Sequence, residues 1–166
     1  MFLLDTEIVL GFRNVKLHES SAGLASWATM TPRHSLFLSA MALLELEHAA
    51  ARAERRQKGA SAAWQGWIHQ QLLPAFEGRI LPVDAAIAVR AARLGYAEIR
   101  DGLLAATAAE HNLTLATRRT NAFKAGRIKL LDPWNFDPDA EGELDADWRE
   151  ASRAGSHWLK NLFVRA

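Results

Sequence analysis

The sequence predicts an α/β fold, a three-layer sandwich in which helices cover both faces of a mainly parallel sheet. Short apolar runs alternate along the chain with longer segments rich in helix-forming residues. Each run is only a few residues long and has no polar residue at every second position, as expected of strands buried on both faces. The predicted strands are residues 2–4, 36–39, 80–82, 113–117 and 128–131.

The segments between these runs carry helix signals of different kinds. A short helix is predicted to begin near Ile8, and another lies around Leu24 and Trp27. Residues 40–50 consist almost entirely of strong helix formers. Residues 61–73 are amphipathic, and Pro74 is expected to end that helix.

The second half of the chain continues the alternation of helix and strand. Asp84 is a good N-cap for a helix over 85–94, and Gly95 is a good stop for it. A strongly apolar helix is predicted to open at Asp101 and to end near His111. Strands that alternate with helices in this way indicate parallel pairing through crossover connections.

Length and composition limit the functional classes. The 166 residues, 49% of them hydrophobic and 23% charged, suit one globular domain. A formal net charge of +1 means that any basic surface for nucleic acid must be local. The sequence has no cysteine, no long apolar span and no basic leader, so we expect a cytoplasmic protein without disulfides, thiolate metal sites or membrane contact.

Three acids fall at or just after a strand end or at a helix start: Asp5, Glu45 and Asp101. In open parallel sheets, ligands bind beyond the carboxyl ends of the strands, which is where these side chains are expected. Each acid also has a purely structural alternative. Asp5 and Asp101 could cap the helices that follow them, and Glu45, flanked by apolar neighbours, could pair with Arg52.

A set of short motifs, taken in order, is similar to a known family. The motifs are Leu3-Leu4-Asp5-Thr6, Leu38-Ser39 with Leu44-Glu45-Leu46, Asp101 with Ala105-Ala106-Thr107-Ala108, Leu113-Thr114-Leu115-Ala116-Thr117-Arg118, and Asp132-Pro133-Trp134. In this order and spacing they resemble the PIN-domain toxins of type II toxin–antitoxin systems, the VapC group, and especially its FitB-like branch. The resemblance covers residues 1–134 and leaves 135–166 as a C-terminal extension.

The resemblance implies a metal-dependent endoribonuclease, a homodimer that a small DNA-binding antitoxin binds and silences. Asp5 and Asp101 would hold Mg²⁺ or Mn²⁺, and Glu45 would complete the catalytic cluster and orient or deprotonate the attacking water. Hydroxyl side chains at four matching positions would support the site by hydrogen bonding: Thr6, Ser39, Thr107 and Thr117. Hard carboxylate oxygens are the ligands that Mg²⁺ prefers.

The sequence departs from the family pattern where a fourth acid is expected. Arg119 and Ala122 stand at positions where the family usually has Asn or Asp and an acid. Glu7 would face the cluster if the first strand stayed extended, and Glu98 lies just ahead of Asp101, so either could supply the missing charge. Two hypotheses follow: an active nuclease with a rearranged acid, or a weakened domain that acts by binding RNA or antitoxin.

Basic residues and the C-terminal extension add two further hypotheses. Arg118 and Arg119 are candidate RNA contacts. The extension starts with an acidic run, which lacks the Glu that a calcium loop requires, and continues with an amphipathic helical pattern. We expect that helix to pack on its own domain or across a dimer, with a basic stripe along the RNA path as the alternative.

Overall fold

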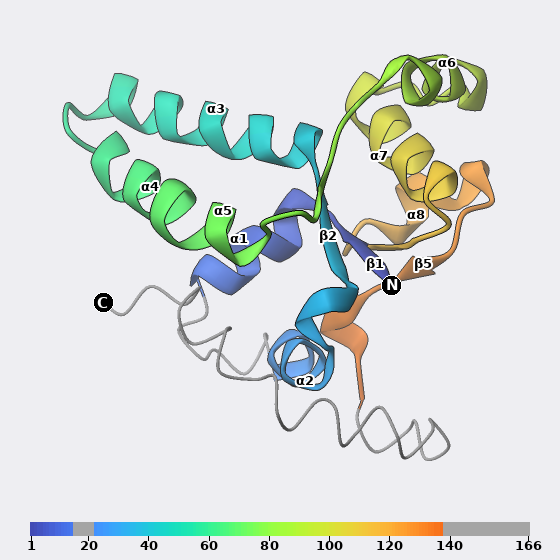
Figure 1. Ribbon diagram of the computed structural model, residues 1–166, viewed down its shortest axis with the longest axis horizontal. Coiled ribbons are helices and arrows are strands. Elements are labelled where there is room, and N and C mark those ends of the chain that lie inside the picture. Colours follow the sequence, from blue (N-terminus) through green and yellow to red (C-terminus); the bar gives the residue numbers. More distant parts are fainter. Residues whose placement is uncertain (15–21, 138–166) are drawn as a thin grey trace.

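The chain forms a five-stranded sheet in which every neighbouring pair is parallel, in the order β3-β2-β1-β4-β5. The structure is a computed structural model, and it describes residues 1–14 and 22–137. The strands are β1 (Phe2–Leu4), β2 (Leu36–Ser39), β3 (Ile80–Leu81), β4 (Thr114–Ala116) and β5 (Leu130–Leu131). The predicted α/β class and parallel sheet are therefore confirmed, and β1 lies at the centre (Figure 1).

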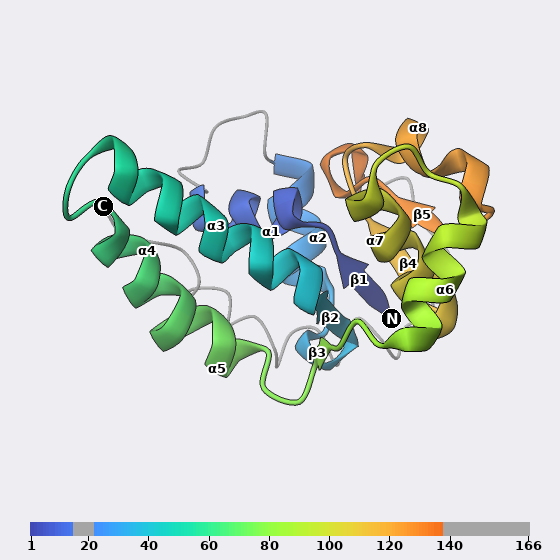
Figure 2. The same ribbon diagram turned by 90° about the horizontal axis from the view of Figure 1, so that it is seen from above.

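One group of helices precedes β3 in the chain. They are α1 (Thr6–Asn14), α2 (Ala22–Met30), α3 (Ala40–Arg56), α4 (Ser61–Trp67) and α5 (Leu73–Ala75). The π-helical segment η3 (Ile68–Leu72) joins α4 to α5, and the short turn η2 (Arg33–Ser35) leads into β2. Figure 2 shows α3 running beside the α4–α5 segment, away from the sheet.

The other group follows β3. It consists of α6 (Ala85–Leu94), α7 (Ile99–Glu110), α8 (Thr120–Phe123), and the turns η4 (Lys124–Gly126) and η5 (Pro133–Asn135). Both views place α6, α7 and α8 on the side of the sheet away from α3 and α4 (Figures 1 and 2). Asp84 caps α6 by accepting from the backbone N–H of Ile87 at 2.9 Å, and Gly95 ends it with φ +69°, both as predicted.

Two hydrophobic cores lie on opposite faces of the sheet because successive strand residues point to opposite sides. Leu4 and Leu38 belong to the core that α1, α2, α3 and α4 cover. Leu3 and Leu115 belong to the core that α7 covers. The central strands are thus buried on both faces, which explains why their sequences are apolar throughout rather than alternating.

Neighbouring elements are held together at two places, the turn between α3 and α4 and the contact between α2 and η5. Glu54 near the end of α3 accepts hydrogen bonds from the backbone N–H groups of Gly59 and Ser61 and from the Ser61 hydroxyl. These hydrogen bonds, of which the one from Gly59 has the largest effect, lower the pKa of Glu54 to about 2. Elsewhere, α2 packs on η5 so closely that a Cβ on Gly23 would lie 2.3 Å from the Trp134 carbonyl oxygen.

Some local expectations were wrong in detail. The first helix begins at Thr6, so Glu7 is helical and not part of an extended strand. Pro74 does not end the helical segment at once, because one further turn, α5, follows a π-helical stretch. Most of the C-terminal extension, from residue 138 on, lies outside the described residues, and the hypotheses about it stay predictions.

Candidate active site

Three carboxylates that are far apart in the sequence meet at the carboxyl ends of the central strands. Asp5 directly follows β1, Glu45 lies in the second turn of α3 after β2, and Asp101 lies in the first turn of α7. The Asp5 side chain is fully buried and that of Asp101 is 8% exposed, whereas 24% of the Glu45 side chain is accessible. The three acids predicted from the sequence therefore form one cluster, at the sheet edge where such folds bind ligands.

A single guanidinium lies among these three acids. Arg100 donates from Nη1 to Asp101 Oδ1 at 2.7 Å, and it contacts Glu45 through Nε and Asp5 through Nη2. Burial alone lowers the pKa of Arg100, but the hydrogen bond to Glu45 and the charges of Asp5 and Glu45 outweigh it, so the pKa is raised. Arg100 is thus a permanent cation that three carboxylates share.

Two of the four predicted supporting hydroxyls contact the acids. Thr117, fully buried at the end of β4, donates to Asp5 Oδ2 at 2.7 Å and accepts from the Arg119 backbone N–H at 3.1 Å. Thr6 donates to Glu45 across the gap between α1 and α3. Each hydroxyl therefore fixes the orientation of one carboxylate from a neighbouring element.

The other two hydroxyls serve their own helices. The Ser39 hydroxyl accepts from the backbone N–H of Met41 at 3.1 Å and so caps α3, which begins close to Glu45. Thr107 is buried within α7 and donates to the Leu103 carbonyl at 2.7 Å. The hydrogen bonds of both residues thus support the helices that carry the acids and not the carboxylates themselves.

The two basic candidates differ in their surroundings. Arg119 forms an ion pair with Asp101, donating to both carboxylate oxygens, and its Nε lies 3.7 Å from Glu7 Oε1. Arg118 is exposed, with its guanidinium 5.4 Å from the centre of the Trp134 ring. Arg119 thus belongs to the charge cluster, whereas Arg118 faces outward.

A polar cavity of about 460 Å³ opens beside the cluster. Glu7 and Glu98, the two candidates for an extra acid, both line it together with Glu45, Arg100, Asp101 and Arg119. Glu7 reaches the cavity from the first turn of α1, although the predicted extended geometry is wrong. The cavity opens the cluster to solvent on the side of Glu45, whose side chain is 24% exposed.

The contacts of these acids bear on their structural alternatives. The N-cap of α7 is Glu98, and Asp101 lies inside the helix, so Asp101 is not a cap. The Asp5 carboxylate contacts Thr117 and Arg100 from other elements, which a local cap does not require. Glu45 pairs with Arg100 of α7, not with Arg52 of its own helix.

Sequence reasoning missed Arg100. The signal that could have found it is its position directly before Asp101, because a residue in the first turn of α7 stands at the same sheet edge as the acid. Only the packing of α7 beside α3 and β1 brings it to Glu45 and Asp5.

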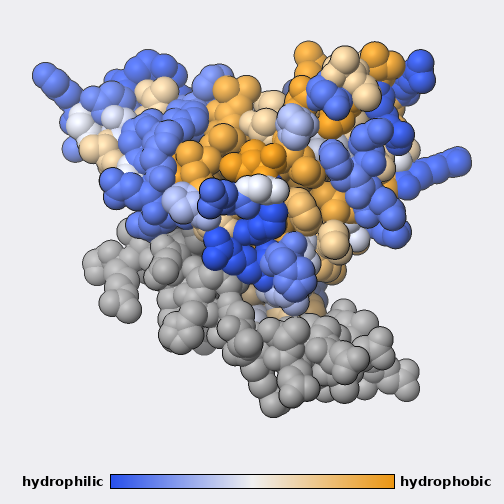
Figure 3. Space-filling model, viewed as in Figure 1, coloured by the Kyte–Doolittle hydropathy of each residue, from blue (hydrophilic) through white to orange (hydrophobic). Residues whose placement is uncertain are grey.

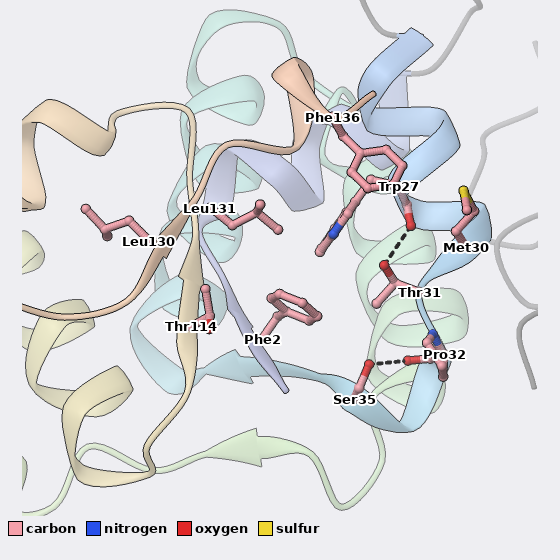
Figure 4. Close-up of a pocket in the computed structure, with 10 residues that line it drawn as sticks. All are labelled: Phe2, Trp27, Met30, Thr31, Pro32, Ser35, Thr114, Leu130, Leu131 and Phe136. Atoms are coloured by element: carbon pink, nitrogen blue, oxygen red, sulfur yellow. Dashed lines mark hydrogen bonds between the residues drawn. The ribbon is translucent and has the colours of Figure 1, made fainter. Parts of the chain in front are cut away.

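A second cavity of about 400 Å³ lies at the other end of the sheet, near α2 (Figure 4). Phe2, Trp27, Leu131 and Phe136 point into it, and its polar groups are hydroxyls such as Thr31 and Ser35, which donate to nearby carbonyls. None of the ten residues that line it is ionisable. It therefore offers no acid or base, and the charged chemistry belongs to the carboxylate cluster.

Known proteins are similar to this chain in sequence. A family model described as "PIN domain" matches residues 2–127. Toxin FitB of Neisseria gonorrhoeae is 32% identical over 143 residues, covering 81% of this chain and 99% of its own. The VapC ribonuclease Y4jK of Sinorhizobium fredii is 30% identical over 149 residues, covering 81% and 98%.

Solved structures agree with these matches. The crystal structure of FitAcB from Neisseria gonorrhoeae superposes with a TM-score of 0.72 at 31% identity, covering 82% of this chain and all of the matched chain. A structure of FitAB bound to a DNA fragment gives the same TM-score at 29% identity, covering 82% and 98%. With the sheet order and the acidic cluster described above, these matches assign the chain to the PIN-domain family, in the group that holds the FitB and VapC toxins.

Proposed function

We propose that this protein is a Mg²⁺- or Mn²⁺-dependent endoribonuclease, the toxin of a toxin–antitoxin pair that acts in the cytoplasm. The observation that carries the proposal is the convergence of Asp5, Glu45 and Asp101 on one cationic group at the carboxyl ends of the strands. The kinship with a VapC ribonuclease supports RNA as the substrate class.

The chemical type of the donors, carboxylate oxygens, suits a divalent metal. Asp5 and Asp101 would hold it through carboxylate oxygens, the hard ligands that Mg²⁺ and Mn²⁺ take. In the structure the two carboxylates lie on either side of one cation, the guanidinium of Arg100, which contacts Asp101 through Nη1 and Asp5 through Nη2. A bound divalent ion would lower the pKa of water and offset negative charge on the phosphate.

Other roles in the proposed reaction fall to individual side chains: activation of water, orientation of the acids and contact with RNA. Glu45 is the most accessible of the three acids and lines the cavity, so it is placed to orient the attacking water and to accept its proton. Thr117 and Thr6 hold Asp5 and Glu45 in their orientations. Arg118 is exposed and follows Thr117 in the chain, and it would contact an RNA phosphate.

Two partner proteins complete the proposal. The solved FitAB complexes, one of them bound to DNA, support a cognate DNA-binding antitoxin that binds and silences this chain. Exposed apolar side chains support a homodimer: Leu44 of α3, Val83, Val89 of α6 and Ile99 of α7. Figure 3 shows hydrophobic side chains gathered on the face between α3 and the α6–α7 pair.

A second candidate function is RNA or antitoxin binding with weakened catalysis. The observation that favours it is the presence of two arginines within the acid cluster, because their charges offset much of the negative potential that a metal needs. Among the described residues no helix is both long and apolar enough to cross a membrane.

Cleavage of RNA by the purified protein tests the proposal. We expect cutting with Mn²⁺ or Mg²⁺, none with EDTA, and none with the Asp5→Asn variant, which keeps the shape of the side chain but removes its charge. Glu77→Gln is the matched control, because Glu77 is an exposed acid ahead of β3, at the opposite edge of the parallel sheet. Cutting by Asp5→Asn at the wild-type rate would refute the assignment, and RNA binding without cutting by any form would favour the second candidate.

A further inference from the structure

Every carboxylate oxygen of the three central acids already accepts a hydrogen bond. Arg100 donates to one oxygen each of Asp5, Glu45 and Asp101, and Arg119 donates to both oxygens of Asp101. Thr117 and Thr6 take the remaining oxygens of Asp5 and Glu45. Within the described ranges no group of three or more acids or histidines is arranged to hold a metal ion. The guanidinium of Arg100 lies between the three acids instead.

We propose that Arg100 sets the affinity of this site for a divalent ion, because its guanidinium holds the position among the carboxylates that the ion would take. The inference rests on the proposed function and deepens it. The ion and the guanidinium are like charges that would compete for the same oxygens, so metal binding requires Arg100 to leave the cluster. When no metal is bound, the three carboxylates would repel one another if Arg100 were absent, so Arg100 also stabilises the metal-free fold.

The structure gives Arg100 a route out. Its side chain is 22% exposed and lines the cavity beside the cluster, so the guanidinium can turn into that space while α7 stays in place. Arg119 is 36% exposed at the same opening and hydrogen-bonds to Asp101, while its Nε lies farther away, 4.0 Å from Asp5 Oδ2 and 3.7 Å from Glu7 Oε1. The two arginines therefore differ: Arg100 hydrogen-bonds to all three acids, whereas Arg119 hydrogen-bonds to Asp101 only.

Direct measurement of Mn²⁺ binding by calorimetry, together with thermal unfolding in EDTA, tests this inference without any activity assay. Arg100→Gln should bind Mn²⁺ at least about tenfold more tightly than wild type, because a like charge within a few ångströms is removed. It should also unfold at a lower temperature in EDTA and recover more stability than wild type when Mn²⁺ is added.

Two further variants keep the test sharp. Arg52→Gln also removes one positive charge, but from another residue that lines the cavity, and no ion pair between Arg52 and the three acids is described. The Mn²⁺ affinity of this variant should therefore differ from that of wild type by less than about threefold. Arg100→Lys keeps a cation but loses the three-way fork, so it should fold even if Arg100→Gln does not, and it should bind Mn²⁺ more tightly than wild type.

The outcomes separate the inference from the proposed function. Wild-type Mn²⁺ affinity in both Arg100 variants would overturn the inference and leave the metal-dependent nuclease standing. An equal gain in Arg52→Gln would also overturn it, because general electrostatics would then explain the effect. No Mn²⁺ binding by wild type or by either Arg100 variant would overturn both.

Discussion

The hydrogen bond from Thr117 to Asp5 offers a sharp test of how the site is held. Thr117→Val keeps the β-branched shape but removes the hydroxyl that donates to Asp5 Oδ2 at 2.7 Å and accepts from the Arg119 backbone N–H at 3.1 Å. A hydrogen bond to a charged group contributes about 1.5–3 kcal/mol, and a buried oxygen left without its donor costs a similar amount. We therefore expect Thr117→Val to lower the free energy of unfolding by about 2–3 kcal/mol.

Thr107→Val is the matched control for this prediction. Thr107 is equally buried and also loses a 2.7 Å hydrogen bond, but its acceptor is the Leu103 carbonyl of its own helix, not a carboxylate. Its cost should stay below about 1 kcal/mol, because such back-bonding within a helix adds little to stability.

Thermal unfolding in EDTA measures both variants. The Thr117 variant should melt about 5–10 °C below wild type, the shift expected for 2–3 kcal/mol in a domain of this size. Under the proposed function, its RNA cleavage with Mn²⁺ should fall about 10–100-fold, as when the residue that orients a metal ligand is lost. Equal losses of stability in the two variants would refute the reasoning, since burial and not the Asp5 contact would then set the cost.

Three further predictions concern packing, pH and assembly. Gly23→Ala should lower the free energy of unfolding by about 1–3 kcal/mol, since its Cβ would meet the Trp134 backbone at 2.3 Å. A Cβ on Gly66 would have no other atom within 4 Å, so Gly66→Ala should raise the free energy of unfolding by about 0.5–1 kcal/mol. Urea titration measures both variants, and a Gly23→Ala protein more stable than the Gly66→Ala protein would contradict the packing described. Because its folded pKa is depressed to about 2 from 4.5, Glu54 stabilises the protein above pH 4.5, and this contribution is lost as the pH falls towards 2. Glu54→Gln should therefore lower the melting temperature near neutral pH and make it fall less steeply as the pH is lowered. A pH dependence of the melting temperature equal to that of wild type would show that the Glu54 hydrogen bonds in the α3–α4 turn do not contribute to it. Finally, Ile99 is 81% exposed, and the proposed homodimer would bury it. Ile99→Gln should therefore shift the mass measured by light scattering from dimer towards monomer, whereas a dimer that the substitution leaves unchanged would place the interface elsewhere.

Local sequence patterns were sufficient for the strands and for most of the helices. Runs such as Leu36–Ser39 must be strands buried on both faces, because they are too short for helices and have no polar side. Asp84 and Gly95 bound α6 where expected, since caps and left-handed stops act within one turn. The start of α1 was less certain because Thr6 and Glu7 suit either an extended or a helical backbone.

The sequence by itself also determined which acids meet, because strand ends in a parallel sheet share one edge, and Asp5, Glu45 and Asp101 each follow such an end or begin the next helix. The sequence did not determine which cation offsets the negative charges of these three acids. Arg100 lies 55 residues from Glu45 and 95 from Asp5 in the chain, and only the packing of α7 against the sheet brings its guanidinium to both. The positions of acids follow from a repeating architecture, whereas a long, flexible side chain finds its partners only after the elements have packed. Tertiary structure therefore decided the charge balance of the site.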